Sequence, residues 1–111
     1  MTIRELAEKL PARVLAGEEG LDRSFEGCYV GDLLSWVMGR AAAGDVWITV
    51  MGNVNAIAVA ALADCACIVL AESASLDAEA AARANQQGIP VLASEDNSFR
   101  LAVRTAGLLP K

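Results

Sequence analysis

The segment Val50–Asn55 contains the residues whose types and spacing best fit the binding of a small ligand. Gly52, Asn53 and Asn55 follow a continuous apolar run, Val46–Met51, and precede an alanine-rich segment. Glycine lets a ligand approach the backbone closely, and asparagine amides donate hydrogen bonds to polar groups. Two interpretations stay open. The segment is either a ligand site between a buried strand and a helix, or a plain turn in which asparagine caps the helix.

Asp22 and Arg23 form a second candidate binding site. An exposed arginine beside an aspartate can bind a carboxylate or a phosphate. The same pair can instead anchor a loop through a salt bridge and backbone hydrogen bonds. We favour the anchoring role and keep ligand binding as the alternative.

Catalytic and metal-binding patterns are missing from the rest of the sequence. The chain has no histidine, no phosphate-binding loop of the G-x-x-x-x-G-K-[ST] type and no G-x-S-x-G segment. Cys65 and Cys67 have no second cysteine pair to complete a zinc or iron–sulfur site, and Cys28 leaves an odd number of thiols. We therefore expect no catalytic residue, no metal, no cofactor and reduced cysteines; a small enzyme that uses carboxylates is the less favoured alternative.

Charge and hydropathy argue against nucleic-acid and membrane partners. The 111 residues carry a net charge of −5, with nine basic and fourteen acidic side chains, so few cations are available for phosphates. Charge appears at once in Met1–Glu5, unlike in a signal peptide. The longest apolar run, Ala56–Ala63, is far shorter than the roughly 20 residues that span a bilayer. These features predict a cytoplasmic protein.

Helical and extended segments alternate along the chain. The expected helices are Thr2 to about Lys9, Gly31 to about Ala42, Val54–Asp64, Leu76 to about Gln87, and a last one ending near Ala106. The expected extended segments are Ala12–Ala16, Glu26–Val30, Val46–Met51, Cys67–Ala71 and Val91–Ala93. Alternation with short connections predicts an α/β fold of three layers, α/β/α, around a mostly parallel sheet. No linker interrupts it, so we expect a single domain over residues 1–111.

The helix Val54–Asp64 has no polar face. A stripe of Val54, Ile57 and Leu62 is expected to face the sheet, yet the opposite side, with Val59, Ala60 and Ala63, is apolar as well. Helices that cover a sheet normally present one polar face to water. The opposite side is therefore expected to contact another protein surface.

Two neighbouring helices support this expectation of a contact surface. Trp36 lies opposite an inward stripe of Leu34, Val37, Met38 and Ala41, and Leu101 lies opposite a stripe of Phe99, Ala102, Val103 and Ala106. Tryptophan is enriched where proteins meet. We therefore predict a homo-oligomer, most simply a two-fold dimer, with Trp36, Val59, Ala60, Ala63 and Leu101 as candidate interface residues.

Several segments together resemble one known family, the DRTGG domain. They are Leu21–Gly27, Tyr29–Ser35, Gly44–Val50, Asn55–Ala60 and Gly88–Leu92. The resemblance runs from about Val14 to the end of the chain. Asp22, Arg23 and Gly27 keep part of the family signature, whereas Ser24 stands where the signature has threonine. At Gly52–Val54 the chain also lacks a histidine that is frequent in the family.

The resemblance implies a fold like that of the N-terminal domain of HPr kinase/phosphorylase. It also implies an accessory role in bacteria, because other domains carry out catalysis in the larger proteins that contain this domain. From it we expect a non-catalytic regulatory or interaction module that docks on a larger metabolic or redox protein. The alternative is a sensor of a nucleotide or acidic metabolite that binds at Gly52–Asn55.

Overall fold

A five-stranded sheet forms the centre of the molecule in the computed structural model, which describes residues 1–110. The strands are β1 (Arg13–Ala16), β2 (Gly27–Val30), β3 (Asp45–Thr49), β4 (Cys67–Leu70) and β5 (Val91–Ala93), in the order β1-β5-β4-β3-β2. The four strands β2 to β5 are parallel, and β1 pairs antiparallel with β5. The predicted mostly parallel sheet is confirmed.

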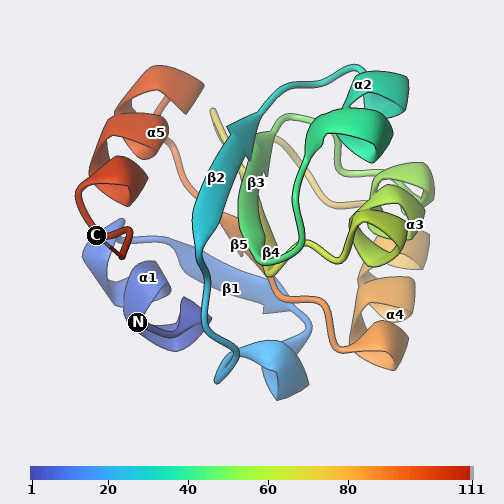
Figure 1. Cartoon of the computed structure of the whole chain (residues 1–111). Helices are drawn as coiled ribbons and strands as arrows, with labels where there is room; N and C mark the ends of the chain where they lie inside the picture. The colour runs from blue at the N-terminus through green and yellow to red at the C-terminus, as the bar shows by residue number, and fades with distance from the viewer. Residues whose placement is uncertain (111) are drawn as a thin grey trace.

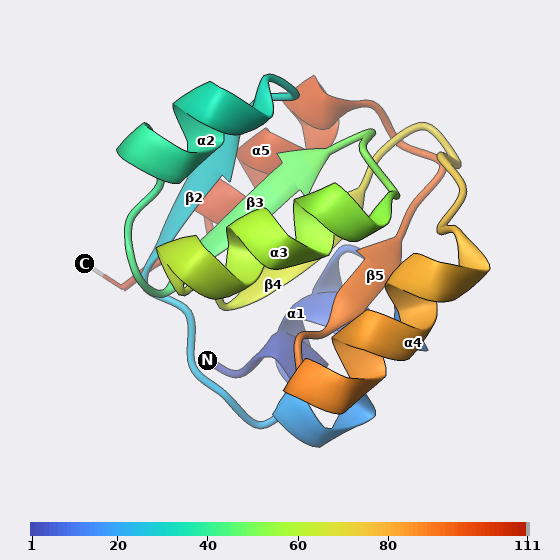
Figure 2. The ribbon, with the colours of Figure 1, turned by 90° about the vertical axis from the view of Figure 1, so that its right-hand side faces the viewer.

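Five α-helices cover the two faces of the sheet. They are α1 (Ile3–Lys9), α2 (Leu34–Arg40), α3 (Val54–Ala63), α4 (Ala78–Gln87) and α5 (Ser98–Ala106); a 3₁₀ turn spans Glu18–Gly20. In Figure 1 the helices α2, α3 and α4 lie on one side of the sheet, and α1 and α5 lie on the other. Figure 2 shows α3 in the middle of its layer, between α2 and α4. The predicted three-layer α/β/α architecture is confirmed.

The parallel strands follow one another in sequence order. Each connection from β2 to β5 passes through a helix of the same layer, so the strand order never reverses among them. Open α/β sheets bind ligands most readily where neighbouring connections leave on opposite faces. This sheet has no such opening between its parallel strands, which bears on the candidate site at Gly52–Asn55.

Each sheet face packs its own apolar cluster. Val46, Ile48 and Cys67 face α1 and α5, whereas Trp47, Ile68 and Leu70 face α2, α3 and α4. Strands buried on both faces read as unbroken apolar runs, which is why they were recognisable in the sequence. The indole N–H of Trp47 donates to the carbonyl of Gly31 at 2.9 Å, so even the largest core side chain has its polar atom paired.

Helix ends follow the capping residues of the sequence. Thr2 and Glu5 form a capping box at α1, and the side chains of Asn53 and Asn97 accept from the first turns of α3 and α5. Gly88 ends α4 with a φ of +64°, a left-handed conformation that glycine adopts without strain.

The inward faces of α3 and α5 differ from the prediction. Val59 and Ala60 of α3 are buried in the core cluster between the helices and the sheet, whereas Leu62 is 72% exposed. In α5 it is Leu101 that is fully buried, whereas Phe99 and Val103 are exposed. The predictions that Val59, Ala60 and Leu101 lie at an outer surface are therefore wrong, and Ala63, also placed there, is half-buried against the core. On α3 every side is apolar, so periodicity could not identify the side that faces the sheet.

The start of α2 also differs from the prediction. The helix begins at Leu34 rather than at Gly31–Asp32. The Oδ1 atom of Asp32 accepts instead from the Thr49 hydroxyl at 2.7 Å and from the Val50 backbone N–H at 3.0 Å. Asp32 thus fastens the end of β2 to the end of β3.

Candidate functional site

The segment Val50–Asn53 lines one wall of a cavity at the carboxyl ends of the strands. The cavity has a volume of about 410 Å³, and the opposite wall consists of Ala74, Ser75 and Asp77. This hollow is shallow and wide open to solvent, and its lining is mainly polar. Whether its polar groups are free for a ligand depends on the bonds that they already make.

Gly52 is used for packing within the chain. A Cβ atom at this position would overlap the carbonyl oxygen of Ser75, and the Gly52 carbonyl accepts from the backbone N–H of Asp77 at 2.8 Å. The close approach that glycine permits is therefore made by the β4–α4 loop. It fixes two neighbouring loops to each other.

Asn53 caps α3, as the second interpretation of this turn predicted. Its side-chain oxygen accepts from the backbone N–H of Ala56 at 2.9 Å. Asn55 lies on the exposed side of the first turn of α3, and its side chain makes no hydrogen bond within residues 1–110. Of the three candidate ligand residues in this turn, only Asn55 keeps all its side-chain hydrogen-bonding groups free.

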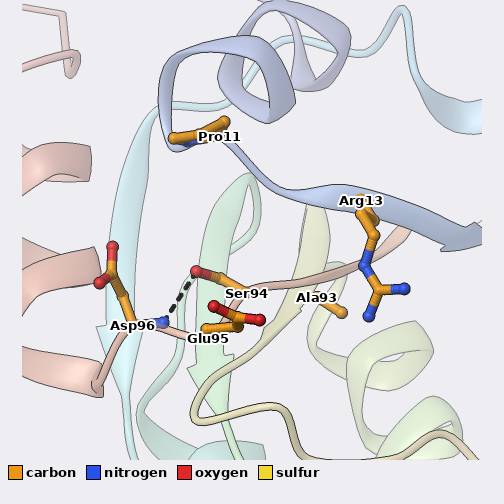
Figure 3. Close-up of a pocket in the computed structure, with 6 residues that line it drawn as sticks. All are labelled: Pro11, Arg13, Ala93, Ser94, Glu95 and Asp96. Atoms are coloured by element: carbon orange, nitrogen blue, oxygen red, sulfur yellow. Dashed lines mark hydrogen bonds between the residues drawn. The ribbon is translucent and has the colours of Figure 1, made fainter.

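A second cavity of about 320 Å³ lies where β5 ends beside the start of β1 (Figure 3). Its lining includes Arg13, Ser94, Glu95 and Asp96. The Ser94 hydroxyl accepts from the backbone N–H of Asp96 at 3.1 Å, and Asp96 also pairs with Arg104 at 2.6 Å. With Asp96 paired internally and Glu95 on the wall, this cavity has no concentration of positive charge for an anion.

Asp22 and Arg23 point to different partners. Asp22 pairs with Arg4 of α1 at 3.0 Å, and that hydrogen bond lowers the pKa of the carboxyl group. The Arg23 guanidinium reaches the end of α3, where it donates to the Asp64 carboxylate and to the Asp64 carbonyl, each at 3.0 Å. Asp64 is the C-cap of α3 and has a left-handed φ of 57°. Because Arg23 bonds to both the carboxylate and the carbonyl of this residue, it secures the terminal turn of the helix. These contacts match the favoured anchoring role.

The three cysteines are free thiols in apolar surroundings. Burial is the main cause that raises the pKa of Cys28 and of Cys65 to about 11, and the carboxylate of Asp45 contributes. Burial also raises the pKa of Cys67 strongly. Because the thiolate is the reactive form, none of the three is suited to nucleophilic chemistry near neutral pH. Within residues 1–110, no group of three or more cysteine, aspartate and glutamate side chains is arranged to hold a metal ion.

Large apolar side chains are exposed on three helices. Trp36 of α2 is 52% exposed, with Leu33 beside it at 57%; Leu62 protrudes from α3; and Phe99 of α5 is 75% exposed. The sequence predicted an exposed Trp36. The exposure of Leu62 and Phe99 was not predicted, because the apolar periodicity placed both on inward faces. Leu33 was not assigned to any face. In the part of the chain that the structure describes, no helix is both long and apolar enough to cross a membrane.

Comparisons with known proteins agree with the architecture. A solved structure of the CBS and DRTGG domains in the regulatory region of Clostridium perfringens pyrophosphatase, complexed with its activator diadenosine tetraphosphate, superposes with a TM-score of 0.73. The match covers 98% of this chain and 47% of that chain at 15% sequence identity, so it shows a shared fold. No curated protein matches the chain.

The family is identified from the sequence over almost its whole length. The model of the DRTGG domain matches residues 5–107. This range includes Asp22 and Arg23, the turn at Gly52 and all five strands. The chain belongs to the DRTGG domain family.

Proposed function

We propose that this chain is a cytoplasmic, non-catalytic regulatory or protein-interaction module, formed by residues 1–111 as one domain. It acts as a homodimer and serves a larger metabolic or redox enzyme. The observation that carries the proposal is the exposure of Trp36, Leu62 and Phe99 on three different helices. Scattered exposed apolar residues are ordinary, but tryptophan and phenylalanine are enriched at protein interfaces.

The bonding of the polar residues supports the same proposal. Gly52, Asn53 and Arg23 are engaged in fixing loops and helix ends. The thiols of Cys65 and Cys67 are buried, and that of Cys28 is half-buried. In the pyrophosphatase neighbour, a DRTGG domain is part of a regulatory region together with CBS domains, which is consistent with an accessory role.

The oligomeric state is the first test of this proposal. Sedimentation equilibrium across micromolar concentrations should give a mass well above that of one chain. A single species of 11.6 kDa at every concentration would contradict the homodimer.

The partner enzyme is tested with tagged protein and matched surface variants. Leu62→Glu and Phe99→Glu should each be compared with Ala82→Glu, which adds the same charge at an exposed alanine of α4. We expect wild type and Ala82→Glu to retain one stoichiometric enzyme from native lysate and to change its activity when added back. Loss of that enzyme in Leu62→Glu or in Phe99→Glu would identify the docking helix. Failure of wild type to retain any stoichiometric enzyme would contradict this part of the proposal.

A second candidate function is a small-molecule sensor at the Gly52–Asn55 turn. It is favoured by the 410 Å³ cavity, whose lining includes Asn53, and by the free amide of Asn55, which lies in the first turn of α3 just outside that lining. Nucleotides and acyl phosphates should then raise the unfolding temperature of wild type, and Asn55→Ala should abolish that rise without lowering the temperature of the free protein. Absence of a shift with every compound would argue against a sensor.

A further inference from the structure

The cavity at the carboxyl end of β5 is lined by one positive and one negative side chain that are both unpaired. Arg13 belongs to β1, and Glu95 belongs to the turn between β5 and α5. Neither forms an ion pair within residues 1–110, either with the other or with a third residue. Opposite charges that line one cavity without meeting leave room between them for a ligand with charges of both signs.

The two charges lie on different sides of this cavity. In Figure 3, Arg13 extends from β1 on one side, and Ser94 and Glu95 lie on the other. Pro11 and Ala93 supply the apolar part of the lining. The volume of about 320 Å³ is at the lower end of the range of roughly 300–1,000 Å³ that is typical of small-molecule sites.

Ser94 adds a fixed polar atom on the side of Glu95. It is only 9% exposed, and its backbone N–H and carbonyl are bonded to Leu70 and Ser73 at 3.0 Å and 2.9 Å. Its Oγ atom accepts one hydrogen bond, from the backbone N–H of Asp96. A hydroxyl oxygen has a second lone pair, which no group within residues 1–110 uses. A buried, held side chain thus leaves part of its hydrogen-bonding capacity to a ligand.

Asp96 contributes little net charge to the cavity. Its carboxylate pairs with Arg104 at 2.6 Å and lies 4.0 Å from Arg100. The uncompensated charges are therefore those of Arg13 and Glu95. A simple anion would be repelled by Glu95 and a simple cation by Arg13, whereas a zwitterion satisfies both.

We propose that this cavity binds a free α-amino acid with a small aliphatic side chain. The ammonium group donates to the Glu95 carboxylate and to Ser94 Oγ, and the carboxylate accepts from the Arg13 guanidinium. The aliphatic side chain packs on Pro11 and Ala93. Because Arg13 and Glu95 are exposed, we expect a dissociation constant on the order of 1 mM. The site goes beyond the proposed function and does not depend on the homodimer.

Titration of the full chain with L-valine, followed in ¹H–¹⁵N NMR spectra, tests the site. We expect saturable shifts of the backbone amide signals of Arg13, Ser94 and Glu95. Isobutylamine lacks the carboxylate of valine, and 3-methylbutanoate lacks its amine, so each should bind about fivefold more weakly or worse. Absence of saturable shifts with L-valine would overturn the site. Equal binding of either analogue would overturn the recognition of a zwitterion.

Neutral variants with matched controls locate the binding. Arg13→Gln and Glu95→Gln should fold normally, because both side chains are exposed and unpaired, and each should weaken L-valine binding about fivefold or more. Arg83→Gln and Glu79→Gln remove the same charges from exposed positions of α4 and should bind as wild type does. Equal binding by all four variants would overturn the assignment.

The pattern of shifts separates this site from the turn at Gly52. Ser94→Ala also removes the acceptor for the Asp96 N–H, so the charge variants rather than Ser94→Ala decide the test. Saturable shifts confined to Asn53 and Asn55, and unchanged in Arg13→Gln, would place the ligand at the other cavity and overturn the present assignment.

Discussion

The Gly52–Asn55 turn and the outer side of α2, formed by Leu33, Trp36 and Gly39, differ in residue types and in the contacts that these residues already make. The turn is rich in residue types that bind ligands, yet Gly52 and Asn53 are bound to the chain itself. The outer side of α2 contains no pattern of chemical interest, yet Leu33, Trp36 and Gly39 leave apolar surface and empty space uncovered. Residue types indicate what a segment is able to bind, whereas the contacts that its groups already make decide which of them remain available for a ligand or a partner.

Glycine substitutions provide the sharpest test of this comparison. In Gly52→Ala the new Cβ would overlap the Ser75 carbonyl, which is backbone and has no easy way to move. We expect the free energy of unfolding to fall by about 3 kcal/mol or more. In Gly39→Ala nothing is touched, and the gain in helix propensity should stabilise α2 by up to about 1 kcal/mol. Urea denaturation of both variants measures the difference. Equal stabilities would show that the close approach at Gly52 is not required.

The Asp22–Arg23 pair allows the same comparison within two adjacent residues. Arg23→Ala removes the guanidinium from the carboxylate and carbonyl of Asp64 at the end of α3, and should cost about 1–2 kcal/mol of unfolding free energy. Asp22→Ala breaks only the exposed bridge to Arg4, and should cost less than about 1 kcal/mol. Chemical denaturation at moderate salt ranks the two variants. A larger loss in Asp22→Ala would contradict the role of Arg23 in anchoring the end of α3.

Asn53 tests whether the turn acts as a helix cap. Asn53→Ala removes the acceptor for the Ala56 N–H and should cost about 1 kcal/mol. Asn53→Asp keeps an acceptor at the same position and adds a negative charge at the N-terminus of α3, so it should be as stable as wild type. Thermal unfolding of both variants checks the expectation. If Asn53→Asp were as unstable as Asn53→Ala, the amide donor rather than the oxygen would be the important group.

The element order and most helix ends, the start of α2 excepted, could be predicted from the sequence because local chemistry determines them. Thr2 with Glu5, Asn53, and Gly88 each cap a helix end within one or two residues of the expected boundary. The buried strands β3 and β4 were recognisable as apolar runs. The position of the Gly52 turn, beside the loop that precedes α4, also follows from the predicted sheet, because loops at the carboxyl ends of parallel strands gather at one edge of the sheet.

Side-chain direction could not be predicted where it depends on distant contacts. α3 is apolar on every side, so its orientation is decided by the helices α2 and α4 that flank it. In α5 the more apolar stripe contains Phe99 and Val103, yet the side that faces the sheet is the one with Leu101 and Thr105. The hydrogen bonds from Thr49 and Val50 to Asp32 join residues that are 17 and 18 positions apart in the sequence. No local sequence pattern predicts such contacts.

Trp36 should show the smallest effect on folding. At protein concentrations below those at which the chain self-associates, Trp36→Ala removes only a half-exposed ring and its stacking with Arg40. We expect the free energy of unfolding to change by less than about 1 kcal/mol, since exposed cation–π contacts contribute little. At concentrations where wild type is dimeric, the same change should lower the unfolding temperature, because dimerisation stabilises the folded state by mass action.

The buried Trp47 supplies the matched control for Trp36. Trp47→Phe leaves the Gly31 carbonyl without its N–H donor and leaves a space in the core, so it should destabilise the chain by about 1–3 kcal/mol at every concentration. We expect the loss of stability in Trp36→Ala to depend on protein concentration and the loss in Trp47→Phe to be the same at every concentration. That result would show that Trp36 contributes to association and Trp47 to folding. If Trp36→Ala destabilised the dilute protein as much as Trp47→Phe, Trp36 would be part of the core, and the comparison between the turn and the outer side of α2 would fail.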